Sequence, residues 1–262
     1  MADSVTFAVA AEAYDRHVGR YGSALADGLI GVAGIQPGQR ALDVGSGPGA
    51  LTHALVAVLA EENVAAVDPS ESFVAALRDR LPRVDVRLAA AESLPFDDAS
   101  FDAALAQLVV NFMAEPERGV AEMRRVTRNG GTVAACVWDY AGEMTLLRCF
   151  WEAAAALDPE RVRSRDERVT MRFSHAGELA DLWRGVGLRE VEDGELVVAA
   201  DYECFDDLWG PFAAGVAPSG AYAASLDEDR RRDLRDEYRR RLGSPDGPFR
   251  LSARAWYAVG RT

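Results

Sequence analysis

The sequence predicts an α/β fold on two observations. Short apolar stretches of strand length alternate with helical patterns along most of the chain, which is typical of this class. In addition, the first apolar stretch runs directly into a glycine-rich turn, where sheets of this class hold a nucleotide. Strands are expected at residues 41–44, 63–68, 84–89, 102–107, 131–138, 188–198 and 250–260. Helical patterns separate the first five, and another covers residues 175–186.

The glycine-rich turn is the most informative stretch of the chain. A buried strand is expected over Ala41–Val44, glycines follow at positions 45, 47 and 49, and a helix is expected from Pro48 to Glu61. Glycine tolerates positive φ angles and lets a ligand approach the main chain closely. A nucleotide binds at the carboxyl end of such a strand, beside the N-terminus of the next helix.

Two carboxylates narrow the identity of the ligand. Asp68 ends the second expected strand, 23 residues after Gly45 (68 − 45), where an acidic group can accept hydrogen bonds from both ribose hydroxyls. Asp43 lies just before the turn, and the glycine spacing is one residue shorter than that of dinucleotide folds. A carboxylate there repels a pyrophosphate and suits a positively charged ligand. S-adenosyl-L-methionine (Ado-methionine) has an ammonium and a sulfonium and no phosphate.

Four sequence blocks in this order carry a resemblance to a known family. They are Leu42–Gly49, Val67–Ser70, Ala91–Phe96 with Phe101-Asp102, and Glu122–Gly131. Over about residues 10–140 the chain resembles the class I Ado-methionine-dependent methyltransferases, most closely the ubiquinone/menaquinone-biosynthesis-like (type 11) group. The resemblance implies a Rossmann-like seven-stranded sheet, in the order 3-2-1-4-5-7-6 with strand 7 antiparallel, and a helical lid insertion. It also implies Ado-methionine as the cofactor.

The resemblance assigns cofactor contacts residue by residue. The glycine turn is expected under the methionine part of the cofactor, and Asp68 at the ribose hydroxyls. Ala90 stands where relatives often have an Asp that accepts from the adenine amine, so Glu92 becomes a candidate for that contact. The expected cofactor-binding residues of the sheet are Asp43, Gly45, Ser46, Gly47, Asp68, Pro69, Ser70, Ala91, Glu92, Gln107 and Leu108.

The N-terminal segment Ala10–Tyr21 also resembles a segment of these relatives, a mobile helix that covers the cofactor. The resemblance implies that Tyr14 caps the pocket and that Arg20 pairs with the cofactor carboxylate. The same residues also fit an amphipathic helix whose tyrosines simply pack, and the sequence leaves both interpretations open.

The expected reaction is an in-line displacement in which the protein mainly positions the reactants. A base is needed only for an acceptor whose pKa lies well above the ambient pH, and the candidates are His17, Asp139 and Glu143. An aromatic pocket for a flat or lipophilic acceptor is a hypothesis, and the alternative is that most of these side chains form the core of the lid. The candidate substrate residues are Phe112, Trp138, Trp209, Phe212 and Tyr222.

A single domain is expected over residues 1–262, because strand 250–260 is needed to complete the sheet. Its expected parts are an N-terminal helical cap (1–35), a cofactor-binding core (36–140) and a substrate-side half (141–262). Within that half, the lid insertion covers about residues 202–248 and contains a hinge-like loop at 215–222. Helices are expected at 143–157 and 227–242.

Composition excludes several classes of function. The net charge of −13 argues against a nucleic-acid or anionic-membrane surface. All 29 basic residues are Arg, so a Schiff-base or Walker-A lysine is excluded. Three scattered cysteines, Cys136, Cys149 and Cys204, indicate reduced core thiols in the cytoplasm. No metal is expected, since no cluster has ligand spacing, and no apolar run has membrane-spanning length.

Taken together, the residues predict methyl transfer from Ado-methionine to a small-molecule acceptor, at an O, N or C nucleophile. Two alternatives stay open. A non-methylating member of the fold, such as a cofactor-holding cyclase or a binding module, would have the same cofactor blocks. An NAD-dependent oxidoreductase is disfavoured by Asp43 and by the short glycine spacing. The sequence determines neither the acceptor nor the oligomeric state.

Overall fold

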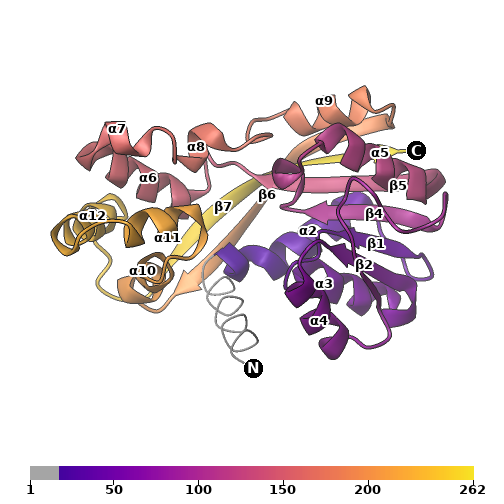
Figure 1. Cartoon of the computed structure of the whole chain (residues 1–262), viewed down its shortest axis with the longest axis horizontal. Coiled ribbons are helices and arrows are strands. Elements are labelled where there is room, and N and C mark those ends of the chain that lie inside the picture. Colours follow the sequence, from indigo (N-terminus) through magenta and orange to yellow (C-terminus); the bar gives the residue numbers. More distant parts are fainter. Residues whose placement is uncertain (1–17) are drawn as a thin grey trace. The chain divides into compact units, whose positions relative to one another are not determined.

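The computed structural model describes residues 18–262, and a seven-stranded sheet runs through it (Figure 1). The strand order is β3-β2-β1-β4-β5-β7-β6. Strands β1 to β5 pair in parallel, and β7 is antiparallel to β5. The expected fold class, strand order and antiparallel strand are therefore confirmed. The strands are β1 (Ala41–Val44), β2 (Val64–Asp68), β3 (Asp85–Leu88), β4 (Phe101–Gln107), β5 (Thr127–Trp138), β6 (Arg189–Tyr202) and β7 (Phe249–Arg261).

Helices connect the strands. The helices that precede β1 or lie between β1 and β5 in the chain are η1 (Val18–Tyr21), α2 (Gly22–Ala33), α3 (Ala50–Leu59), η2 (Glu61–Asn63), α4 (Glu71–Arg80), η3 (Val110–Phe112) and α5 (Pro116–Val126). Those between β5 and β6 are α6 (Thr145–Leu157), α7 (Pro159–Val162), α8 (Glu167–Thr170) and α9 (Glu178–Gly185). The insertion between β6 and β7 consists of α10 (Phe205–Ala213), α11 (Ala217–Ala224) and α12 (Glu228–Arg241).

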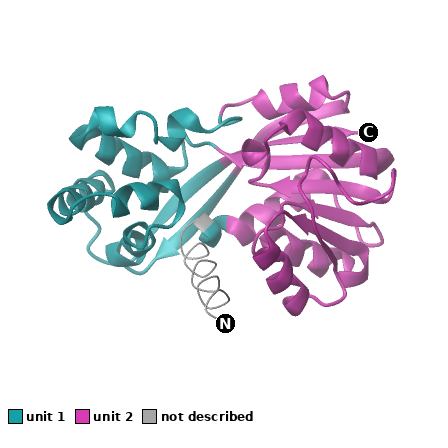
Figure 2. Cartoon of the chain, viewed as in Figure 1, with its two compact units in different colours: residues 1–21, 139–174, 197–254 teal, residues 22–138, 175–196, 255–262 magenta. Residues whose placement is uncertain are grey.

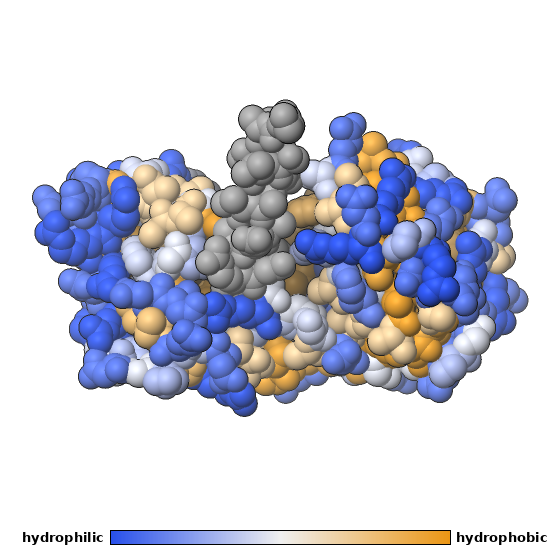
Figure 3. All heavy atoms as spheres, turned by 90° about the horizontal axis from the view of Figure 1, so that it is seen from below, coloured by the Kyte–Doolittle hydropathy of each residue, from blue (hydrophilic) through white to orange (hydrophobic). Residues whose placement is uncertain are grey.

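The chain divides into two compact units (Figure 2). The sheet unit comprises residues 22–138, 175–196 and 255–262. The helical unit comprises residues 139–174 and 197–254, together with the described N-terminal residues Val18–Tyr21. The face seen in Figure 3 is mostly hydrophilic, with hydrophobic patches between the hydrophilic side chains.

The sheet unit has an apolar core built on its central strands. Strands β1 and β2 are buried along their whole length, as is typical of parallel strands covered on both faces. Helix α2 packs on α3 and β5, and α5 packs on β4 and β5. Fully buried Trp183 in α9 donates its indole N–H to the Val133 carbonyl oxygen in β5, at 2.9 Å. This bond fixes α9 to the sheet.

The helical unit has a separate, aromatic core. The rings of Phe150 in α6 and Phe212 in α10 stack with centroids 4.5 Å apart. Tyr238 in α12 packs edge-on against both, and its hydroxyl donates to the Leu146 carbonyl oxygen at 3.0 Å. The insertion therefore forms its core together with α6.

Two expectations about local structure are wrong. The segment at 215–222 is not mainly a hinge loop, because α11 begins at Ala217 and Pro218 occupies its first turn, a position that proline favours. Cys204 is exposed, whereas Cys136 and Cys149 are the core thiols that the sequence predicts. Within residues 18–262, no helix combines the length and the apolar character that a membrane span requires.

The aromatic core predicts a large difference between two phenylalanines. Phe150→Ala should lower the free energy of unfolding by ~3–5 kcal/mol, because it leaves a cavity among stacked rings. Phe112→Ala should change it by less than about 1 kcal/mol, because Phe112 is 61% exposed. Urea unfolding of both variants checks this, and equal losses would contradict the position of the core.

Candidate cofactor-binding site

The candidate site lies where β1, β2 and β4 end, on neighbouring strands of the sheet. The chain turns sharply after β1 because Gly45 N–H and Ser46 N–H both donate to the Val67 carbonyl oxygen of β2, at 2.8 and 3.0 Å. Gly47 has φ +50°, and a Cβ added there would meet no atom within 4 Å. The turn therefore presents an open glycine face to which a ligand can come close.

Asp68 ties this turn to the end of β2. Its Oδ2 accepts from Gly47 N–H at 2.8 Å, and its Oδ1 accepts from Ser70 N–H at 2.8 Å. Ser70 is in turn the N-cap of α4. An ionised carboxylate has about four acceptor sites, so each oxygen keeps capacity for one more donor. This capacity is what a pair of ribose hydroxyls would use.

Asp43 is 1% exposed. Its Oδ2 accepts from the Thr52 hydroxyl at 2.6 Å. Burial raises the pKa of the Asp43 carboxyl from 3.8 to about 7, the Thr52 bond opposes this rise, and the nearby Asp68 carboxylate adds to it. Asp43 is therefore held close to its protonation midpoint at neutral pH, and a nearby cation would favour its ionised form.

Three buried polar atoms at the ends of β1 and β4 have no hydrogen-bond partner within residues 18–262. They are Asp43 Oδ1, Ser46 Oγ and Gln107 Oε1. The Gln107 amide is held in place, because its Nε2–H donates to the Gly22 carbonyl oxygen at 3.0 Å. A buried polar atom without a partner costs about 1–3 kcal/mol. Their concentration beside the glycine turn makes this place a candidate site for a polar ligand.

The residue after β4 is strained. Leu108 has φ +62°, a conformation that costs a branched L-residue roughly 1–2 kcal/mol. Its N–H donates to the Cys136 carbonyl oxygen of β5 at 2.9 Å, which helps to hold this conformation. Such strain is concentrated at ligand sites in proteins. Leu108 and Gln107 thus form a second, constrained strand end beside the glycine turn.

The residues expected around adenine are partly engaged by the backbone. Glu92 Oε1 accepts from the N–H groups of Ala114 and Glu115, at 2.8 and 3.3 Å, just before α5 begins. Ala91 is buried, and Pro69 is exposed. The assignment of Glu92 to the adenine amine stays a prediction. Within residues 18–262, no backbone N–H group donates to Glu92 Oε2 in the way that those of Ala114 and Glu115 donate to Oε1.

The N-terminal candidates are only partly described. Tyr14 and His17 lie outside the described residues. Arg20 forms an ion pair with Asp207 of α10, with Nη1 2.9 Å from Oδ2, and its guanidinium lies 4.8 Å from the centre of the Tyr202 ring. All three residues belong to the helical unit. Pairing of Arg20 with a cofactor carboxylate would have to compete with Asp207.

The two described base candidates differ sharply in their surroundings. Asp139 is buried and accepts from Gly142 N–H and Glu143 N–H, both at 2.9 Å, and from Arg254 Nη2 at 2.8 Å. This carboxylate holds the turn after β5, and acting as a base would require it to give up these bonds. The Glu143 side chain is 60% exposed, 3.7 Å from Arg254.

The aromatic candidates separate into three groups. Trp209 and Phe212 pack within the core of the helical unit, with ring centroids 5.9 Å apart. Trp138 is buried at the end of β5. Phe112 is largely exposed on η3, and Tyr222 lines a pocket of the helical unit. Of the five, Phe112 and Tyr222 are therefore the ones that a bound molecule can contact without rearranging a core.

Sequence reasoning missed Thr52 as the partner of Asp43. The available signal was a hydroxyl on the largely apolar helix Ala50–Leu59, nine residues after Asp43. A polar residue on a buried helix face usually has a partner. It also missed the bond between Gln107 and Gly22, which joins residues 85 positions apart.

Known proteins resemble this chain in sequence. Residues 42–135 match the family model described as "Methyltransferase domain". An uncharacterized methyltransferase of Mycobacterium tuberculosis is 36% identical over 140 residues, which cover 53% of this chain and 54% of that protein. Demethylmenaquinone methyltransferase of Renibacterium salmoninarum is 33% identical over 112 residues, covering 43% of this chain and 46% of that enzyme. The chain thus matches about half the length of these relatives.

Solved structures share the fold. A SAM-dependent methyltransferase from Thermotoga maritima is 22% identical, with a TM-score of 0.55 over 95% of this chain and 94% of that one. The [4+2]-cyclase SpnF is 21% identical, with a TM-score of 0.57 over 91% of this chain and 80% of that one. The sheet order and the sequence matches define a class I methyltransferase domain. Residues 42–135 therefore form a methyltransferase domain, in agreement with the resemblance seen in the sequence.

The family and fold imply use of Ado-methionine, and the residues present fit this molecule. Its ammonium is a donor for the partnerless oxygens of Asp43 and Gln107. Its ribose hydroxyls match the remaining acceptor capacity of Asp68. The glycine face at Gly47 has room for a ligand.

Two glycines give a matched test of the open face. Gly47 and Gly38 both have positive φ, +50° and +88°, and neither has an atom within 4 Å of an added Cβ. Alanine at either position should therefore cost a similar ~1 kcal/mol of stability. Only Gly47→Ala should weaken binding of S-adenosylhomocysteine, by at least about tenfold, in calorimetric titration. Equal affinities of the two variants would exclude Gly47 from the ligand surface.

Asp43 predicts a pH dependence of stability. Because its folded-state pKa is raised to about 7, its stabilising contribution is complete below about pH 4 and is lost as the pH rises towards 7. In that window each pH unit should lower the free energy of unfolding by about 1.4 kcal/mol. Burial also raises the pKa of Glu167 to about 7, so a second group acts in the same direction.

The two contributions can be separated by denaturant unfolding between pH 5 and 7. Asp43→Asn and Glu167→Gln should each remove about half of the slope, and the double variant should remove most of it. An unchanged slope in Asp43→Asn would show that Asp43 is ionised in the folded protein throughout this range.

Proposed function

We propose that this protein transfers the methyl group of Ado-methionine to a small-molecule acceptor, at an oxygen, nitrogen or carbon nucleophile. The observation that carries the proposal is the group of partnerless buried oxygens on Asp43, Ser46 and Gln107 beside the open face of Gly47. A scaffold gains nothing from such atoms, whereas a bound cofactor with donor groups satisfies them.

Each part of the site has a proposed role. Asp68 orients the ribose, because its two oxygens are already fixed by Gly47 and Ser70. Asp43 and Gln107 receive the ammonium, and Ser46 completes the surface around the methionine part. Pro69, Ser70, Ala91 and Glu92 border the adenine. Leu108 lies at the end of β4, where the methionine part and the transfer site meet.

When bound, Ado-methionine supplies a methyl group on a positively charged sulfur. The protein contributes alignment, which is worth ~7–11 kcal/mol when the reacting atoms are held ~3–3.5 Å apart. Of the two described base candidates, the Asp139 carboxylate is engaged by two N–H groups and Arg254, and the Glu143 side chain is 60% exposed. We therefore propose an acceptor that loses its proton readily to solvent. Exclusion of water from the site of transfer then strengthens the attraction between an anionic acceptor and the sulfonium.

We propose that the helical unit selects the acceptor and that the insertion at about residues 202–248 acts as a lid. The support is the division of features along the chain: the described cofactor candidates, except Arg20, belong to the sheet unit. The three cysteines, none of them in a disulfide, support a cytoplasmic location.

The decisive experiment compares ligands and then follows the methyl group. Ado-methionine or S-adenosylhomocysteine at a hundred times its dissociation constant should stabilise the folded protein by ~2.7 kcal/mol, and NAD should not. A panel of small phenols, amines and carbon acids with methyl-labelled Ado-methionine should then give a labelled product.

The other outcomes identify the alternatives. Stabilisation by NAD and by neither sulfur ligand would indicate an oxidoreductase. Binding of the sulfur ligands with no transfer to any acceptor would favour a cyclase or a binding module. Asp68→Ala serves as the internal control, since it should weaken cofactor binding by at least tenfold through loss of charged hydrogen bonds.

A further inference from the structure

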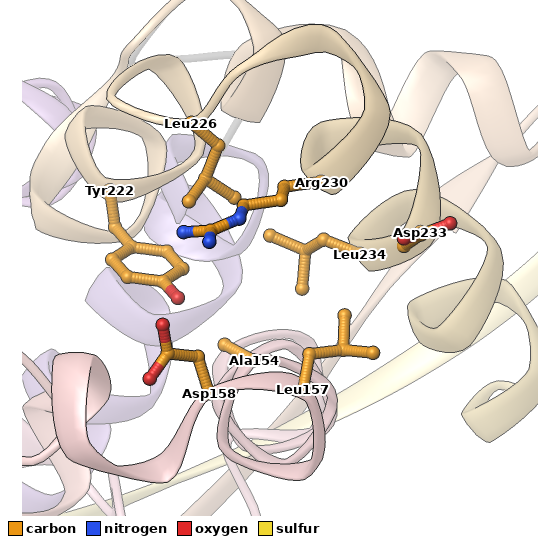
Figure 4. A pocket seen from close by; sticks show the side chains of 8 residues that line it. All are labelled: Ala154, Leu157, Asp158, Tyr222, Leu226, Arg230, Asp233 and Leu234. Atoms are coloured by element: carbon orange, nitrogen blue, oxygen red, sulfur yellow. The ribbon is translucent and has the colours of Figure 1, made fainter.

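A pocket of about 240 Å³ lies within the helical unit, between α6, α11 and α12 (Figure 4). None of its lining residues is a cofactor candidate. Its apolar wall is formed by Leu157, Leu226 and Leu234, and the Tyr222 ring closes one side (Figure 4). Its charged groups are Asp158, Arg230 and Asp233, of which Asp233 points away from the cavity in Figure 4.

The pocket is the right size for a small organic molecule. At ~30 Å³ for each water-sized group, its volume of about 240 Å³ holds about eight such groups. Leu226, Leu234 and Tyr222 are at most 7% exposed, so the wall is fixed by the surrounding packing. Its apolar character favours a flat or branched hydrocarbon body.

The charge at the Tyr222 end of the pocket is positive. One carboxylate, Asp158, and three guanidiniums, Arg161, Arg165 and Arg230, act electrostatically on the Tyr222 hydroxyl. Of these, Asp158 and Arg230 line the pocket, whereas Arg161 and Arg165 donate to Ser225. The Asp158 carboxylate is partly used locally, since it accepts from Arg161 N–H at 3.1 Å. The Arg230 guanidinium lies 3.6 Å from the Asp227 carboxylate, beyond hydrogen-bond distance. This concentration of arginines stands out in a chain with a net charge of −13.

We propose that this pocket is a binding site for a small organic anion, of the class of the aromatic carboxylates. The apolar body lies against Leu157, Leu226 and Leu234, and the anionic group lies at the Tyr222 end, next to the Arg230 guanidinium. A planar guanidinium is well suited to a carboxylate, because it can donate two parallel hydrogen bonds. The site goes beyond the proposed methyl transfer and does not depend on it.

Three probes with the same ring and different charges test the proposal on the full chain without cofactor. Benzoate should bind about tenfold more tightly than benzylamine, and benzyl alcohol should fall between them, in NMR titrations. Because no cofactor is added, failure of the methyltransferase proposal leaves this result unaffected. Equal or tighter binding of benzylamine, or no binding of benzoate, would overturn the proposal.

Two arginines of α12 provide a matched pair of variants. Arg230 and Arg232 are similarly exposed, at 59% and 60%, and each pairs with an aspartate three residues earlier, but only Arg230 lines the pocket. Arg230→Gln should weaken benzoate binding about two- to fivefold, as expected for an exposed ion pair. Arg232→Gln should leave it unchanged.

A third variant locates the bound ring. Leu157→Ala should weaken benzoate and benzyl alcohol by the same factor, since Leu157 supplies only apolar contact and is 48% exposed. Thermal unfolding of each variant confirms that the helical unit is intact. Equal effects of Arg230→Gln and Arg232→Gln would place the anion elsewhere and overturn the assignment of this pocket.

Discussion

The carboxylate of Asp68 is the interaction on which the site depends. It joins the glycine turn after β1 to the start of α4, through N–H groups of Gly47 and Ser70. Together with the two bonds to the Val67 carbonyl oxygen, it fixes the turn without using any side chain of the turn itself. The glycine face is therefore left open, and a rigid backbone presents it. Such preorganisation lowers the entropic cost of ordering the site when a ligand binds.

Several energetically unfavourable features lie together in the sheet unit, at the ends of β1 and β4. Burial makes the ionised form of Asp43 unfavourable, Gln107 Oε1 has no partner within residues 18–262, and Leu108 adopts a strained conformation. The buried carboxylate of Asp139 shows the contrast, because two backbone N–H groups and Arg254 satisfy it. Polar groups without a partner at a strand end therefore indicate a candidate binding site, whereas a fully paired carboxylate indicates a structural role. In the sequence the two cases look alike, because both Asp43 and Asp139 are acidic residues at the end of a strand.

Local features of the sequence predicted most of the sheet unit. Continuous apolar runs identify β1 and β2, and the resemblance supplied the strand order, which no single segment encodes. The sequence could not decide roles that depend on distant partners. The Asp139 carboxylate is paired with Arg254, 115 residues away, and no local pattern indicates this partner. Trp209 and Phe212 have the same spacing whether they line a pocket or fill a core, and only the stack on Phe150 distinguishes these cases. Helix α11 was hidden by its Gly, Pro and Ser content.

Separate cores have a consequence for specificity. The sheet unit is packed around β1, β2 and β4, and the helical unit around Phe150, Phe212 and Tyr238. Substitutions that share no contacts have nearly additive effects, so residues of the insertion can change without disturbing Asp68 or the glycine turn. The cofactor site is constrained by backbone geometry, whereas the wall of the helical pocket is built from ordinary leucines and one tyrosine. In the pocket proposed above, a change of ligand therefore requires substitutions of these wall residues, none of which is a cofactor candidate.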